Sequence, residues 1–99
     1  MLDIGCGFGG LAKLVSAHLN IPEAHGIDLD FEVLKEAQEK GIVTHHLDVD
    51  HGRLPFPDGY FDLVISFGML DYLPFFDHCI CEISRVTRRG GHVLVSLPN

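Results

Sequence analysis

The chain has 99 residues, 46% of them hydrophobic, which is enough for one compact core and for one domain at most. Fourteen acidic residues against seven basic ones give a formal charge of −7, which disfavours nucleic-acid binding, because that needs a basic surface. The sequence has no apolar run of membrane-spanning length and nothing that resembles a signal peptide, so we expect a cytoplasmic protein without a membrane partner.

The three cysteines are an odd number and lack the spacing of a disulfide framework, which predicts reduced thiols. A metal site made of His78, Cys79 and Cys81 is disfavoured by geometry, because helix positions two apart point to nearly opposite sides. We therefore predict no metal site, and we expect most of the seven histidines at the surface.

Residues 1–10 read as a short buried strand, a glycine-rich turn and the start of a helix. Glycines at 5, 7, 9 and 10 allow a sharp bend and let a ligand approach the backbone, and Cys6 lies within this turn. The pattern predicts a site for a nucleotide-like group. Its spacing alone also fits the dinucleotide fingerprint Gly-x-Gly-x-x-Gly, through Gly5, Gly7 and Gly10.

Asp3 separates the two cofactor classes, because it is a carboxylate inside an otherwise apolar strand. A buried carboxylate needs a cationic or donor-rich partner. S-adenosylmethionine (SAM) offers an ammonium and a sulfonium, whereas a dinucleotide would bring a repelled diphosphate. The run Leu2-Asp3-Ile4-Gly5-Cys6-Gly7-Phe8-Gly9 resembles motif I of the class I SAM-dependent methyltransferases at every defined position.

After the turn, apolar residues at helical spacing predict a first helix over 10–19, and a second strand follows over 23–28. Asp28 ends that strand, where a carboxylate can accept hydrogen bonds from both ribose hydroxyls, and Leu29 is expected beside the adenine. Asp30 is the expected cap of a second helix over 31–40, so Asp28 is not needed for capping.

Residues 42–47 are apolar and β-branched enough for a third strand. In the resembled family the residue after this strand binds the adenine amino group. Asp48 matches that position, with Asp50 as a competitor by register, and Val49 would contact the adenine as well.

Residues 54–59 are too rich in turn residues for a helix and lead into a fourth strand over 61–66. The run Leu-Pro-Phe-Pro-Asp-Gly-x-Phe-Asp-Leu-Val resembles the link into motif II of small-molecule methyltransferases. The resemblance implies that Ser66 and Phe67 line the methyl-donor end of the pocket. Asp71 and Tyr72 stand where relatives often carry histidine, so they are weak candidates for a catalytic role and equally plausible as ordinary helix-start residues.

Apolar spacing predicts a third helix over 75–88, which Gly90 and Gly91 should end. A fifth strand is expected over 91–96. This arrangement predicts an α/β, Rossmann-like, doubly wound parallel sheet of strand order 3-2-1-4-5, with the ligand where strands 1 and 4 diverge.

The resemblance implies that residues 1–99 form a SAM-binding core domain, truncated relative to the seven-stranded fold of the family. It implies SN2 transfer of a methyl group from SAM to a small-molecule acceptor. Two alternatives stay open, a non-catalytic SAM-binding module or fragment and, with less support, an NAD-dependent oxidoreductase. One sheet face beside strands 4 and 5 should lack cover, so we expect self-association there.

Overall fold

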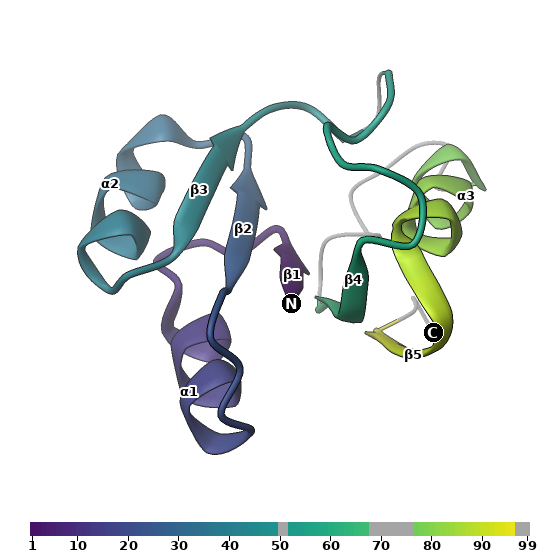
Figure 1. The fold of residues 1–99 in the computed structure, drawn as a ribbon. Coiled ribbons are helices and arrows are strands. Elements are labelled where there is room, and N and C mark those ends of the chain that lie inside the picture. Colours follow the sequence, from purple (N-terminus) through teal and green to yellow (C-terminus); the bar gives the residue numbers. More distant parts are fainter. Residues whose placement is uncertain (50–51, 68–76, 97–99) are drawn as a thin grey trace.

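The computed structural model describes residues 1–49, 52–67 and 77–96 (Figure 1). Asp50, Asp71 and Tyr72, named above as candidate site residues, lie outside the described residues. In chain order the elements are β1 (Leu2–Ile4), α1 (Gly10–His18), β2 (His25–Asp28), α2 (Phe31–Glu39), β3 (Val43–His46), β4 (Phe61–Ser66), α3 (Asp77–Val86) and β5 (Thr87–Val95). None of the helices within these ranges has the length and apolar character needed to cross a bilayer.

The five strands form one sheet in the order β3-β2-β1-β4-β5, and every pairing is parallel. The predicted fold class and strand order are confirmed. Because β1 pairs with both β2 and β4, the carboxyl end of β1 lies at the point where the chain order reverses. The register Ile4 to Ile27 places the glycine-rich turn next to the end of β2.

The helices divide between the two faces of the sheet, as their apolar residues require. Ala12 of α1 and the pair Leu34 and Ala37 of α2 pack in one core cluster. Helix α3 packs on the other face, in a second cluster with Leu2 and Ile4, and lies beside β4 and β5, apart from α1 and α2 (Figure 1). Among the described residues, α3 is thus the one helix that covers this face of β4 and β5.

Helix α2 begins as predicted, because the Asp30 side chain accepts a hydrogen bond from the Glu32 N–H at 2.9 Å. Gly41 follows the helix with a φ of 90°. Leu34 and Ala37 are buried, whereas Phe31 at the start of the helix is exposed.

The boundary between α3 and β5 differs from the prediction. The helix ends at Val86 and the strand begins at Thr87, so Gly90 and Gly91 lie inside the strand segment rather than at a helix stop. Thr87 already pairs with Phe61 of β4, and the Arg88 side chain pairs with Asp62 of the same strand. The Thr87 hydroxyl still donates to the Ile83 carbonyl of the helix at 2.6 Å. Gly90, with a φ of 80°, lies in the shifted register that follows.

Residues 52–60, the described part of the link that leads into β4, contain no helix and are held by α3 instead. The Arg85 guanidinium donates to the carbonyl oxygens of Leu54 and Phe56 at 2.9 and 2.8 Å and to the Asp58 carboxylate at 2.8 Å. Glu82 is buried, accepts from the Leu54 N–H at 2.7 Å and pairs with Arg85. Arg85 holds the pKa of Glu82 below its usual range, chiefly by hydrogen bonding.

Two histidines lie against the same link. His25, buried on β2, is 2.9 Å through Nδ1 from Nε2 of His45 on β3, and its Nε2 is 2.5 Å from a Glu23 carboxylate oxygen. The Glu23 carboxylate only accepts, so the His25 Nε2–H is the donor in that contact. Phe56 packs edge-on against both rings. Burial and His25 lower the pKa of His45.

An apolar groove of about 570 Å³ runs between α1 and the outer strands. Leu11 and Leu19 on the α1 side and Leu94 on β5 are exposed along it. Leu14 is also exposed, at 65%, so most of the apolar stripe of α1 faces outward and only Ala12 is buried. The described residues thus present an apolar surface on the α1 side of β4 and β5.

Candidate functional site

The glycine-rich turn is fastened to the end of β2 by its backbone. The N–H groups of Gly5 and Cys6 both donate to the Ile27 carbonyl, at 2.7 and 2.9 Å. The Gly7 N–H donates to the Asp28 carboxylate at 2.9 Å. The parallel pairing of β1 and β2 thus brings Asp3, the turn and Asp28 to one edge of the sheet.

Asp28 shapes this edge before any ligand arrives. One oxygen accepts from the Gly7 N–H and the other from the Asp30 N–H, each at 2.9 Å. A carboxylate oxygen has two acceptor sites, so each oxygen retains one for a hydroxyl. Asp28 therefore orders the turn and still has the capacity to bind a diol.

Asp3 is 3% exposed, and no described residue gives its carboxylate a hydrogen bond. Burial, and secondarily the Asp28 charge, raise the pKa of Asp3 to about 7. A cation delivered to this position would relieve both effects, so the residues present fit a ligand with a positively charged group.

The glycines of the turn differ in what surrounds them. A Cβ on Gly7 would meet no atom within 4 Å, which leaves that side open to a ligand, although its φ of 54° favours glycine. A Cβ on Gly9 would lie 2.9 Å from the Ala37 Cβ. Gly9 thus allows α2 to pack closely, whereas Gly7 faces open space. Gly5, with a φ of 78°, provides the bend.

Cys6 has its side chain inside the protein. It is buried, and a Cβ on Gly26 would lie 2.6 Å from its Sγ, so the thiol covers Gly26 of β2. Burial raises the pKa of the Cys6 thiol to about 12, which makes it a poor nucleophile. Only its backbone is available to a ligand.

The remaining predicted site residues fall into two groups. Leu29 is 59% exposed beside Asp28, and Asp48 is half-buried after β3, so both can reach a ligand at this edge. Val49 and Ser66 are buried: Val49 belongs to a core cluster, and the Ser66 hydroxyl donates to the Ile4 carbonyl at 3.1 Å. Phe67 is exposed but lines the groove beside α1.

Two supporting contacts were missed by the sequence reasoning. His46 Nε2 lies 2.9 Å from the Leu29 carbonyl, which can only accept, so His46 donates and holds the turn after β2. Lys40 Nζ donates to the Phe8 carbonyl at 2.7 Å and holds the glycine turn from α2. Neither residue lies in a motif, and only the folded pairing reveals its role.

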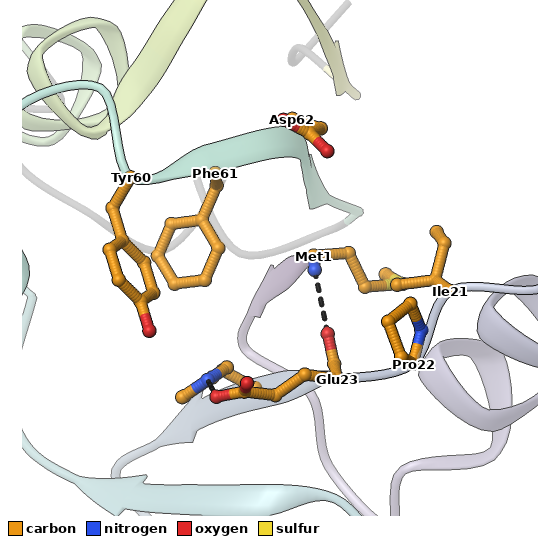
Figure 2. Close-up of a pocket in the computed structure, with 8 residues that line it drawn as sticks. Met1, Ile21, Pro22, Glu23, Tyr60, Phe61 and Asp62 are labelled. Carbon is orange, nitrogen blue, oxygen red and sulfur yellow. Dashed lines mark hydrogen bonds and ion pairs between the residues drawn. The ribbon is translucent and has the colours of Figure 1, made fainter.

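A separate hollow of about 190 Å³ lies at the amino ends of the strands, opposite the glycine turn. Figure 2 shows Met1, Tyr60 and Phe61 around it, with Glu23 and Asp62 at its border. The Met1 amino group donates to the Glu23 carbonyl at 2.9 Å inside it. It shares no lining residue with the edge that holds Asp3 and Asp28.

Comparison with known proteins places this edge in context. Residues 2–95 match a family model described as a methyltransferase domain. The ubiquinone/menaquinone biosynthesis C-methyltransferase UbiE of Burkholderia cenocepacia (strain HI2424) is 37% identical over 101 residues, covering 96% of this chain and 41% of that protein.

Solved structures agree with the family match. An S-adenosylmethionine-dependent methyltransferase from Mesorhizobium loti superposes with a TM-score of 0.85 at 26% identity, over 95% of this chain and 44% of its own. The [4+2]-cyclase SpnF superposes with a TM-score of 0.79 at 30% identity, over 94% of this chain and 36% of its own. The chain thus spans less than half the length of these relatives.

Proposed function

The chain belongs to the methyltransferase-domain family, and from that premise we propose that it binds SAM and transfers the methyl group to a small-molecule acceptor. The observation that carries the proposal is Asp3, a buried carboxylate without a hydrogen-bond donor among the described residues, beside a glycine turn with an open side. Such a group favours a cationic ligand over a diphosphate.

The proposed role of each residue follows from its position along the carboxyl edge of the sheet. Asp3 and the backbone of Gly5, Cys6 and Gly7 would hold the methionine end, with Gly9 supporting the turn from behind. Asp28 would accept the two ribose hydroxyls through its remaining acceptor sites.

The adenine would lie beyond the ribose, near the end of β3. Leu29 would pack on it, Asp48 would accept from its amino group, and Val49, with its side chain in the core, would contribute backbone only. Ser66 would act through the β1 to β4 contact rather than by touching the ligand.

SAM supplies an electrophilic methyl group on its sulfonium, so the protein does not have to activate the donor. The chain's own residues would position the cofactor, which is a contribution that an in-line transfer needs. No side chain of the described residues is assigned as a general base. Asp71 and Tyr72 keep the status of candidates.

A carbon acceptor is the first to test, because the UbiE relatives are named as C-methyltransferases. We further propose that the protein works in the cytoplasm, where its three free cysteines would stay reduced, and that it has no nucleic-acid or membrane partner.

Calorimetric titration tests the cofactor assignment. SAM should bind with a one-to-one stoichiometry and NAD should not, because a diphosphate would face Asp3 and Asp28. Transfer is then tested by mass spectrometry of a metabolite panel incubated with SAM, where a gain of one methyl group in an acceptor is the expected result. Binding of NAD in preference to SAM would overturn the proposal.

A second candidate is a SAM-binding domain without methyl transfer. It is favoured by the similarity to SpnF, which is described as a cyclase, because the same fold therefore carries another reaction. SAM binding together with no methylated product across the panel would favour this candidate.

A further inference from the structure

Asp3 and Asp28 form a pair of carboxyl groups at one edge, and they are not equivalent. Asp28 accepts two backbone N–H groups, and hydrogen bonds to a carboxylate stabilise its charged form. Asp3 has almost no exposure and no such donor from the described residues. Where two carboxyl groups share a site, the one without donors keeps its proton.

The groups around Asp3 do not supply a counter-charge. Asp28 and Cys6 are the titratable groups whose electrostatic interaction with it is evident, and neither is cationic. The ionisable groups on neighbouring elements have other partners or are exposed. His25 contacts Glu23 and His45, and Lys40 donates to the Phe8 carbonyl. Asp62 pairs with Arg88, and Lys13 lies at the surface of α1.

We infer that cofactor binding at this site is coupled to release of a proton from Asp3, which holds that proton while the site is empty and loses it when an α-ammonium group binds. The inference rests on the proposed function and adds its regulation. The proton goes to the solvent buffer, and the ammonium replaces it as the partner of the carboxylate. Since proton and ligand compete for one carboxylate, acidification weakens binding.

The number of protons released on binding follows from the pKa of Asp3 in the empty site. Burial and Asp28 bring the pKa of Asp3 to about 7, so about half of the empty sites are protonated at pH 7. Binding at pH 7 should release about half a proton. Below about pH 6 the dissociation constant should rise about tenfold for each pH unit.

The probes are S-adenosylhomocysteine, which carries the α-ammonium without the sulfonium, and 5′-methylthioadenosine, which lacks the ammonium. Calorimetric binding enthalpies at pH 7 are compared in phosphate and Tris, whose ionisation enthalpies differ. For S-adenosylhomocysteine, the difference in binding enthalpy between the two buffers should correspond to the release of about half a proton per site. For 5′-methylthioadenosine, the binding enthalpy should be the same in both buffers.

Asp3→Asn should abolish the buffer dependence. Asp30→Asn is the matched control, because it removes a nearby carboxylate while asparagine still caps α2, and it should leave the proton release unchanged. Carbon-13 NMR of the empty, aspartate-labelled protein gives a readout that needs no variant. One carboxyl carbon should titrate near pH 7 in the empty protein. When the ligand is added, the pKa of that carboxyl group should fall to the usual aspartate value near 4.

Binding of S-adenosylhomocysteine with the same enthalpy in both buffers would overturn this inference and leave the proposed function standing. So would an empty protein whose aspartate carbons all titrate below about pH 5. If neither SAM nor S-adenosylhomocysteine binds, the proposed function fails together with the inference.

Discussion

Replacement of Gly9 by alanine tests whether this glycine serves helix packing rather than the ligand. The added Cβ would lie 2.9 Å from the Ala37 Cβ and 3.3 Å from Ile42 Cγ1, both in the core between α1 and α2. Gly9 also has a φ of 83°, where alanine is strained. Strain should cost about 1 to 2 kcal/mol and overpacking about 1 to 3, so the variant should lose about 2 to 5 kcal/mol of unfolding free energy.

Gly7→Ala is the matched control for strain alone. Its φ of 54° is also left-handed, but its Cβ would meet no atom within 4 Å, so it should lose only about 1 to 2 kcal/mol. Ala37→Gly combined with Gly9→Ala removes the closest contact, and should recover part of the loss despite about 1 kcal/mol of helix propensity. Recovery is partial, because the Ala37 Cα, at 3.0 Å, remains.

Urea denaturation followed by circular dichroism gives the unfolding free energy of each variant. The wild type, Gly9→Ala, Ala37→Gly and the double variant form one double-mutant cycle, and Gly7→Ala is measured beside it. A coupling of about 1 to 2 kcal/mol between positions 9 and 37 is expected. Equal losses in Gly9→Ala and Gly7→Ala, or no coupling with Ala37→Gly, would refute the packing argument.

Three further predictions concern the ligand edge, the histidine pair and the groove. Asp28→Ala should still fold but weaken SAM binding by about 1 to 3 kcal/mol, and unchanged affinity in calorimetry would contradict the ribose assignment. Since the pKa of His45 is lowered in the folded state, stability should decline as pH falls below about 6.5, and His45→Gln should flatten that decline in urea midpoints; an unaltered pH profile would contradict it. The protein should self-associate in light scattering through the groove, and Leu94→Glu should reduce this while Leu14→Glu, outside the groove, should not; a monodisperse wild-type monomer would contradict the argument.

The strands were predictable where apolar residues form an uninterrupted run. The fourth strand is expected and observed at Phe61–Ser66, because Leu63, Val64 and Ile65 form an apolar run of the kind that a parallel sheet buries. The end of α3 was misplaced, because a glycine pair reads equally as a helix stop or as a strand irregularity. The pairing of Thr87 with Phe61 on β4, and the register shift that follows it, exist only in the folded sheet.

The candidate site was predictable from its motif, but the state of its residues was not. Asp3 and Asp28 were identified by position in the sequence, whereas the two N–H donors that distinguish them come from the folded turn. The pairing of His25 with His45 depends on the parallel register of β2 and β3, which joins residues 20 positions apart. Such contacts depend on which residues the strand register brings together, and they leave no periodic pattern in the sequence.

The hydrogen bonds between α3 and the link before β4 limit how the sequence of the link can vary. Arg85 satisfies the Leu54 carbonyl from 31 positions away, and Glu82 satisfies the N–H of the same residue from 28. Within the link the Phe56 N–H also donates to the Leu54 carbonyl, at 2.8 Å, whereas the Leu54 N–H is bonded by Glu82 from α3. Residues 54–58 and 82–85 are therefore one unit split in two along the chain, and a residue inserted between 54 and 58 should disturb the hydrogen bonds to Glu82 and Arg85.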